Sequence, residues 1–334
     1  MRDRDELARR FERHRDLLRD IAYRMLGSLN EADDVVQEAW LRLDRATSAT
    51  DTKHDGRGTA EAGEGASDED AADGLGIDNL AAWLTTVVSR ICLDQLRSRA
   101  ARREEFVDPA DGSVALASAG AGPRPVFTEP EAEAVLADSV GRAMLVVLRT
   151  LSPDERVAFV LHDMFAVPFD DIAPIVGRTA ATTKKLASRA RQRVRGDTST
   201  PTAELDRHRE VVDAFLSAAR AGDLGALLAV LAPDVVRTAD PAVLPPGIAS
   251  VVRGAAAVAE ETVLLRSRSQ VAGAALIDGA VGLVVAPGGR LAAVLLVTVH
   301  GDRVTAYDVV ADPERLAALT VTVLPEYGTA PVRP

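Results

Sequence analysis

The stretch FDDIAPIVGRTAATTKKLASRARQRVR, residues 169–195, decides how this sequence is interpreted. Apolar residues at helical spacing precede Gly177, which fits the end of a short helix. Thr179 can then cap a second helix that begins at Ala180. Two short helices joined by a tight turn that contains glycine are typical of a helix-turn-helix. The sequence therefore predicts this motif over residues 169–195.

Positive charge gathers on the second of these helices. Residues 177–195 carry seven Lys or Arg and no acidic residue, although the net charge of the whole chain is −11. Thr and Lys side chains near the N-terminal end of such a helix suit base edges in a major groove, and later Arg side chains suit phosphates. The alternative is an ordinary helical hairpin with a solvated basic face.

A second basic block covers residues 80–103, with five Arg and one acidic residue. Apolar residues at helical spacing predict one helix here, and Trp83 lies near its start. Cations that share a helix with an aromatic ring suit single-stranded or melted DNA. A core Trp with a solvated basic face is the alternative.

Acidic side chains open an earlier helix, for which Asn30 is the expected N-cap. Asp33, Asp34, Gln37 and Glu38 lie close together beside Leu41. They suit a docking face for a basic protein partner. Complementation of the helix dipole by these carboxylates is an equally good interpretation.

Composition shifts divide the chain of 334 residues into two or three domains. Residues 47–76 read as a flexible acidic loop, and residues 107–130 and 196–202 as linkers. Everything before residue 196 is helical. Beyond residue 205 two helices precede strands expected at 274–286, 290–300 and 303–310, and hairpin turns separate these strands.

Several protein classes are excluded by composition. No apolar run reaches the roughly 18 residues that span a bilayer, and the charged N-terminus does not read as a secretory signal. Cys92 is the single cysteine, which excludes an intrachain disulfide. No metal-ligand spacing and no cofactor motif occur. We therefore expect a cytoplasmic protein without a membrane, metal or cofactor partner.

Three segments together resemble the extracytoplasmic-function sigma factors. GSLNEADDVVQEAWLRL (27–43) resembles their polymerase-binding helix, and DNLAAWLTTVVSRICLDQLRSRAARR (78–103) their −10-recognition segment. LSPDERVAFVLHDMFAVPFDDIAPIVGRTAATTKKLASRARQRV (151–194) resembles their −35-recognition helix-turn-helix. The resemblance covers about residues 5–195, in the family's order, and implies core RNA polymerase and promoter DNA as partners.

The resemblance also implies roles for individual residues. For −35 DNA these are Thr179, Thr182, Thr183, Lys184, Lys185, Ser188, Arg189 and Arg191. For −10 DNA they are Asp78, Asn79, Trp83, Arg90, Gln95, Arg97 and Arg99, the first two in the loop that captures a flipped base. For core polymerase they are Asp33, Asp34, Gln37, Glu38 and Leu41.

The last part of the chain is similar to the SnoaL-like cone fold, which ketosteroid isomerase shares. A subgroup of these sigma factors carries such a domain as a built-in regulator that contacts the sigma domains. The run Ala311-Asp312-Pro313-Glu314-Arg315-Leu316 resembles the subgroup's Asn-Pro-Asp-Lys-Leu motif. The Asp/Gly-rich motif expected after the first cone strand is not clear in residues 237–243.

The expected architecture is therefore multidomain, with two all-α sigma domains, the second a helix-turn-helix, and a C-terminal α+β SnoaL-like domain. We expect the domains at 1–106, 131–196 and 203–325. The expected function is that of a sigma factor that directs promoter-specific initiation. The alternatives are a helix-turn-helix regulator with a ligand-sensing C-terminal domain, and a cone enzyme fused to a DNA-binding module. Acid–base candidates for that enzyme are Asp240, Asp278, His300 and Asp308, but their spacing does not demand catalysis, so no catalytic residue is expected.

Overall fold

The computed structural model of the protein describes residues 2–54, 79–105, 141–195, 202–241, 244 and 249–324. The chain divides into two compact units, Met1–Arg99 with Val157–Leu186, and Ala100–Arg156 with Ala187–Pro334. The predicted linker at 107–130 lies outside the described residues, as does Asp78.

The first unit begins with the long helices α1 (Arg2–Leu26) and α2 (Leu29–His54), and it contains α3 (Leu80–Glu105) as far as Arg99. The apolar side chains that gave them their helical periodicity are buried, among them Leu18, Leu43 and Leu84. Helix α1 ends as predicted at Gly27, whose N–H donates to the carbonyl of Tyr23 at 2.7 Å.

Two expectations about α2 are wrong. Asn30 lies inside the helix, and the Oγ of Ser28 accepts from the N–H of Glu31 at 3.5 Å in its place. Helix α2 also continues to His54, into the segment expected to be a loop. No Gly or Pro occurs between residues 47 and 54 to end the helix there.

The helix-turn-helix is confirmed, with α7 (Phe169–Val176) and α8 (Ala180–Arg195). Gly177 ends α7 in the left-handed conformation, with φ 69°, and the Oγ1 of Thr179 accepts from the N–H of Thr182 at 3.2 Å. Before these helices lie α5 (Arg142–Thr150), α6 (Pro153–Phe159) and a π-helical turn, η3 (Val160–Met164).

The second unit contains a seven-stranded sheet in the order β2-β1-β6-β5-β4-β3-β7. The strands are β1 (Leu231–Ala239), β2 (Val251–Arg253), β3 (Ala272–Ile277), β4 (Ala280–Val285), β5 (Ala293–His300), β6 (Arg303–Val310) and β7 (Val321–Thr322). Strands β1 and β6 pair in parallel, and all other neighbours are antiparallel. A short 3₁₀ turn, η5 (Pro287–Gly289), connects β4 and β5 where a hairpin turn was expected.

The strand expected over 274–286 is divided by a hairpin. Asp278 and Gly279 have φ values of 50° and 83°, and they turn the chain so that β3 and β4 pair antiparallel. Positive φ at both central residues is characteristic of the tight turns that Asp-Gly favours. The prediction of a single strand is therefore wrong, because the Val- and Leu-rich composition outweighed this turn signal.

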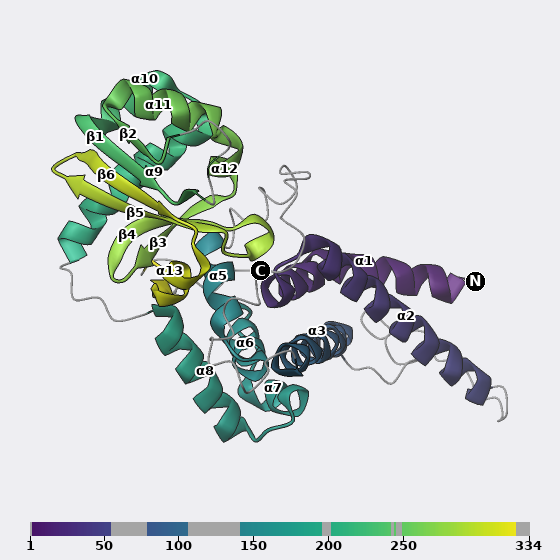
Figure 1. Ribbon diagram of the computed structural model, residues 1–334. Coiled ribbons are helices and arrows are strands. Elements are labelled where there is room, and N and C mark those ends of the chain that lie inside the picture. Colours follow the sequence, from purple (N-terminus) through teal and green to yellow (C-terminus); the bar gives the residue numbers. More distant parts are fainter. Residues whose placement is uncertain are drawn as a thin grey trace. The chain divides into compact units, whose positions relative to one another are not determined.

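Helices pack against both faces of the sheet. One face packs against the helices α9 (Thr202–Ala221), α10 (Leu224–Val230) and α11 (Ala255–Leu264) through residues such as Phe215, Leu227 and Val258 (Figure 1). Two short helices complete the unit, α12 (Arg266–Gln270) and α13 (Pro313–Ala318).

The other face receives α5. Ala143 and Val146 of α5 join a cluster with Ile277, Val284 and Val294 of the sheet. Helix α5 approaches strand β3 so closely that a methyl group on Gly273 would lie 2.9 Å from the Cβ of Arg142. The C-terminal sheet thus shares a core with the helix that leads toward the helix-turn-helix.

Candidate nucleic-acid and polymerase interfaces

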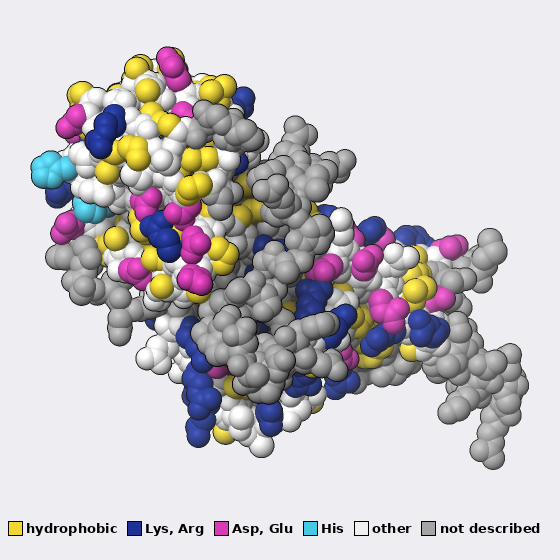
Figure 2. Space-filling model, in the orientation of Figure 1, with side chains coloured by type: hydrophobic (Ala, Val, Ile, Leu, Met, Phe, Trp, Pro, Cys, Tyr) yellow, Lys and Arg dark blue, Asp and Glu magenta, His cyan; other side chains and the backbone are white. Residues whose placement is uncertain are grey.

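Helix α8 presents its cations to solvent. Thr179, Thr182, Lys184, Lys185 and Ser188 are exposed near its N-terminal end. Arg189 is exposed as well, and Arg191 is half-buried. Figure 2 shows Lys and Arg side chains gathered over α8. The position and exposure of these residues match those of a helix that reads a major groove.

Thr183 departs from this group. Its side chain is fully buried, and its hydroxyl donates to the carbonyl of Thr179 at 3.0 Å. Helical periodicity points residue 183 inward, while residues 182, 184 and 185 face outward. The expectation that Thr183 contacts DNA is therefore withdrawn, and its hydroxyl stabilises the start of α8.

A capping box fixes the start of α6. The Oγ of Ser152 accepts from the N–H of Glu155 at 3.4 Å, and a Glu155 carboxylate oxygen accepts from the N–H of Ser152 at 3.1 Å. Arg193 of α8 forms an ion pair with the same carboxylate. Burial alone would raise the pKa of Glu155, but the hydrogen bonds from Ser152 and the charge of Arg193 outweigh it and lower that pKa. Glu155 therefore joins the two helices and was not predicted to do so.

Helix α3 carries residues predicted for −10 DNA, and the three arginines among them already have partners. Arg97 donates to the carbonyl of Val176 at 3.1 Å, and Arg90 to the carbonyl of Pro174 at 3.5 Å. Arg99 forms an ion pair of 2.6 Å with Glu31 of α2. Trp83 and Gln95 are half-buried on the same helix.

Asn79 caps α3. Its side-chain oxygen accepts from the N–H of Ala82 at 3.0 Å, and its carbonyl accepts from the N–H of Trp83 at 3.0 Å. This cap positions Trp83 at the first turn of the helix, next to the segment predicted to capture a base. The sequence did not indicate this capping role.

Helix α2 exposes Asp34 and Gln37, with Leu41 one turn later at 41% exposure. Spacings of three and four residues place these side chains on one helix face. Asp33 and Glu38 are half-buried and bind arginines of the chain itself: Arg19 lies 2.7 Å from Asp33, and Arg42 lies 2.9 Å from Glu38. The five predicted docking residues therefore divide into an exposed group and a paired group.

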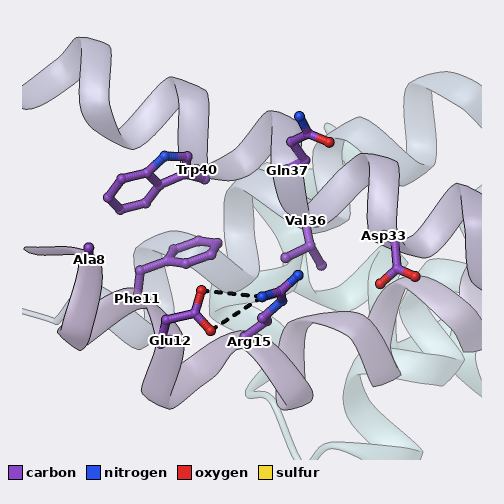
Figure 3. Close-up of a pocket in the computed structure, with 8 residues that line it drawn as sticks. All are labelled: Ala8, Phe11, Glu12, Arg15, Asp33, Val36, Gln37 and Trp40. Atoms are coloured by element: carbon purple, nitrogen blue, oxygen red, sulfur yellow. Dashed lines mark hydrogen bonds and ion pairs between the residues drawn. The ribbon is translucent and has the colours of Figure 1, made fainter.

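A groove between α1 and α2 borders this face (Figure 3). The rings of Phe11 and Trp40 lie 5.1 Å apart at one end of it. Arg15 and Glu12 of α1 form an ion pair beside the rings, and Gln37 of α2 lines the opposite side. The contribution of α1 to this groove was not predicted, because the ring that pairs with Trp40 lies on a different helix.

Two acidic residues of the C-terminal domain, Asp240 and Asp308, bind Arg315, and Asp240 also accepts hydrogen bonds from backbone N–H groups. One oxygen of Asp240 accepts from the N–H groups of Ala311 and Asp312 at 2.8 and 2.9 Å, and the other forms an ion pair with Arg315. Arg315 also lies 2.7 Å from Asp308. Burial alone would raise the pKa of Asp240, but these bonds outweigh it and lower that pKa. The carboxylates therefore act as structural acceptors.

The remaining two candidates lie apart from this cluster. Asp278 accepts from the N–H of Thr320 at 2.8 Å, and His300 is exposed at the end of β5. Among the described residues, no group of His, Cys, Asp and Glu is arranged to hold a metal ion.

A buried ion pair was not foreseen. Arg237 of β1 is 2% exposed, and it pairs with Glu261 of α11 and donates to the carbonyl of Ala249 at 2.8 Å. Burial raises the pKa of the nearby Tyr307 to about 12. This polar group lies inside the domain, where burying an ion pair requires hydrogen bonds to both charges.

Comparison with known families assigns the two helical regions. The sequence matches the family models "Sigma-70 region 2" at residues 10–57 and "Sigma-70, region 4" at residues 141–194. These two regions define a sigma factor of the sigma-70 class. The matches do not extend to α3, so the assignment of −10 contacts to that helix stays a prediction.

Similar proteins indicate which group of sigma-70 factors the chain belongs to. The chain is 39% identical over 245 residues to "ECF RNA polymerase sigma factor SigJ" of Mycobacterium tuberculosis, covering 73% of this chain and 68% of that protein. It is 35% identical over 243 residues to "Probable ECF RNA polymerase sigma factor SigI" of the same species, covering 72% of each. The crystal structure of SigJ aligns with 93% of this chain and 98% of that one, with 32% identity and a TM-score of 0.38.

The chain belongs to the extracytoplasmic-function (ECF) RNA polymerase sigma factors. It therefore directs transcription initiation, and members of this family are not enzymes. The resemblance inferred from the three sequence segments is confirmed, and the two alternatives, a ligand-sensing regulator and a fused enzyme, give way to it. Within the described part of the chain, no helix is both long and apolar enough to cross a membrane.

Proposed function

We propose that α8 reads the −35 element, that α3 holds melted −10 DNA and that α2 docks on core RNA polymerase, all in the cytoplasm. The observation that carries the proposal is the exposure of Lys184 and Lys185 near the N-terminal end of the second helix of a helix-turn-helix. Both cations lie where base edges and phosphates of a major groove are reached.

In vitro transcription tests the −35 assignment. Core RNA polymerase is combined with the full chain and a promoter library. The double variant Lys184→Glu/Lys185→Glu should abolish specific initiation, because it reverses two charges at the DNA face. The matched control Arg253→Glu reverses an exposed charge on β2 and should retain initiation. Equal transcription by both variants would refute the assignment.

Docking on polymerase is assigned to the exposed group on α2. Asp34, Gln37 and Leu41 are available to a partner without breaking an ion pair within the chain. Asp34→Lys should weaken binding to core polymerase about tenfold, which corresponds to the loss of a charge-assisted contact at an interface. Asp16→Lys on the exposed side of α1 serves as the control. Affinity is read by fluorescence anisotropy of the labelled full chain with core polymerase.

The C-terminal α+β domain, residues 203–325, is proposed to be a SnoaL-like cone that modulates initiation through contact with a sigma domain spanning 131–196. This contact is supported by the core that α5 shares with one face of the sheet. Helix α5 lies within the residues that match sigma-70 region 4. Removing the domain would expose Ala143 and Val146 to solvent and destabilise the truncated chain. A change in transcription by a truncated chain therefore does not distinguish lost regulation from lost stability.

A single methyl group offers a milder test. Gly273→Ala places a Cβ 2.9 Å from the Cβ of Arg142 and should loosen the docking of α5. Gly225→Ala in α10 adds a methyl group at an ordinary contact of 3.4 Å and is the control. A change in promoter-specific transcription for Gly273→Ala alone supports modulation. Hydrogen exchange shows whether α5 is loosened in Gly273→Ala. If α5 is loosened but transcription equals that of the unaltered chain, modulation by the C-terminal domain is refuted.

A further inference from the structure

Two arginines of α3 contact the first helix of the helix-turn-helix. Arg97 donates to Val176, the last residue of α7, at 3.1 Å. Arg90 reaches the carbonyl of Pro174 in the same turn. The partners are 79 and 84 residues apart in the sequence, and all four belong to the same compact unit.

The chemistry of a helix end explains this contact. The last carbonyls of a helix lack partners within it, and the helix dipole makes this end electronegative. The N–H groups of Gly177 and Arg178 both donate to the carbonyl of Ala173, which leaves the carbonyls that follow it to outside donors. Arg90 and Arg97 are seven residues apart on α3, so both lie on one helix face and reach the end of α7 together.

A second contact joins the N-terminal helices to the region of the helix-turn-helix. The guanidinium group of Arg24, on α1, lies 4.7 Å from the centre of the Phe165 ring, just after η3. Arg24 is 2% exposed, and its Nε and Nη1 have no hydrogen-bond partner within the described residues. Burial lowers the pKa of Arg24. Arg24 also lies 3.4 Å from Asp20 of its own helix. The contact with Phe165 is lost when the two elements separate, so it favours the closed arrangement.

We propose that the helix-turn-helix is an intramolecular competitor of −10 DNA, since α7 occupies Arg90 and Arg97 in the free chain. The inference rests on the proposed role of α3 in −10 binding. DNA phosphates and the carbonyl end of α7 are both electronegative acceptors, so each arginine can serve one of them at a time. Release of α7 therefore precedes capture of melted DNA.

The contact with Phe165 allows a test that leaves the DNA-binding arginines intact. Phe165→Ala removes the ring beneath Arg24, and Phe165→Leu removes only its aromatic face. Phe169→Ala is the matched control, because that ring stacks on His162 at 3.8 Å within the helix-turn-helix region itself. Binding of the full chain to fluorescein-labelled single-stranded DNA of randomised sequence is measured by anisotropy.

Opening is measured separately by energy transfer between dyes on Asp16→Cys and Asp171→Cys, both at exposed positions. The native Cys92 is fully buried and does not compete for the label. Phe165→Ala should raise the affinity for single-stranded DNA about fivefold, the size of one cation–π contact, and should lower energy transfer. Phe165→Leu should act in the same direction, and Phe169→Ala should change neither quantity.

Different results would refute the competition between α7 and DNA and the proposed role of α3 in −10 binding. If Phe165→Ala and Phe165→Leu lower energy transfer but leave DNA affinity unchanged, competition is refuted. Unchanged energy transfer in both variants refutes the closed contact itself. If DNA binding is insensitive to Arg90→Ala/Arg97→Ala even in the opened Phe165→Leu chain, the −10 role of α3 fails while the closed contact stands.

Discussion

Neighbouring threonines at the start of α8 have different tasks. Thr182 is exposed, whereas Thr183 is buried with its hydroxyl bonded to the carbonyl of Thr179. A DNA-facing helix needs both kinds of residue, because its outer face reads bases only if its inner face holds it in place.

Thr183→Val should lower the free energy of unfolding by about 1 kcal/mol, the net contribution of a buried hydrogen bond, and leave promoter affinity unchanged. Thr182→Val should show the opposite pattern, with weaker promoter binding and little loss of stability. Urea unfolding and promoter binding by the holoenzyme measure the two quantities. A loss of promoter affinity in Thr183→Val, with stability preserved, would restore Thr183 to the DNA face.

Glu155 gives the fold a dependence on acid. Its pKa in the folded chain lies below the ordinary value of 4.5, because Ser152 and Arg193 stabilise the carboxylate beyond the cost of burial. A lowered folded-state pKa stabilises the fold above the unfolded-state pKa, and this stabilisation is lost as the pH falls through the folded-state value.

Glu155→Gln should therefore lower the free energy of unfolding by about 1 kcal/mol at pH 7 and have a smaller effect in acid. The comparison uses urea unfolding at neutral pH and below pH 4. Glu210→Gln, an exposed position in the middle of α9, is the control and should show neither change. A loss of stability that is the same at both pH values would mean that the carboxylate charge is unimportant.

At the scale of elements, local signals were sufficient for the helix-turn-helix and for strands β5 and β6, but not for the whole sheet. Gly177, Thr179 and Ser152 act within four residues of themselves, so their capping bonds could be predicted from the sequence. Strands β2 and β7 are only three and two residues long, and they depend on distant partners. No local pattern marks such edge strands, and neither was predicted.

The candidate sites follow the same division. The sequence located the helices that carry the proposed DNA and polymerase contacts, because charge and spacing are visible along one chain segment. It could not show that Arg97 reaches Val176, since that bond joins residues 79 apart in the sequence. The Asn79 cap was missed although it is as local as the cap at Thr179. The burial of Thr183 was accessible in principle from helical periodicity.

Arg315 holds α13 against the ends of two strands. It pairs with Asp240, which follows β1, and with Asp308 of β6. Arg315→Ala should leave the sheet intact and free α13, so the amide hydrogens of Ala311 and Asp312 should exchange several-fold faster. Arg253→Ala, an exposed arginine on β2, is the control. Unchanged exchange at both amides would show that Asp240 holds this turn without Arg315.

At the scale of the molecule, the distribution of charge disfavours binding of the free chain to DNA. The chain carries a net charge of −11, yet residues 177–195 carry seven positive side chains and no negative one. Long-range repulsion between the acidic chain and DNA opposes the local attraction of α8. A chain with this pattern gains from a partner that brings DNA and both DNA-binding helices together.

Tethering on polymerase should therefore dominate promoter affinity. When two weak sites are held by one partner, the second binds at an effective concentration that raises the overall affinity by about 10²- to 10⁴-fold. We expect the free chain to bind a −35 duplex weakly, and the holoenzyme to bind a promoter with both elements tighter by that factor. Anisotropy with the two probes at one salt concentration measures the ratio. Equal affinity for the free chain and the holoenzyme would mean that the helix-turn-helix alone supplies promoter recognition, and that the contacts assigned to α3 contribute nothing to it.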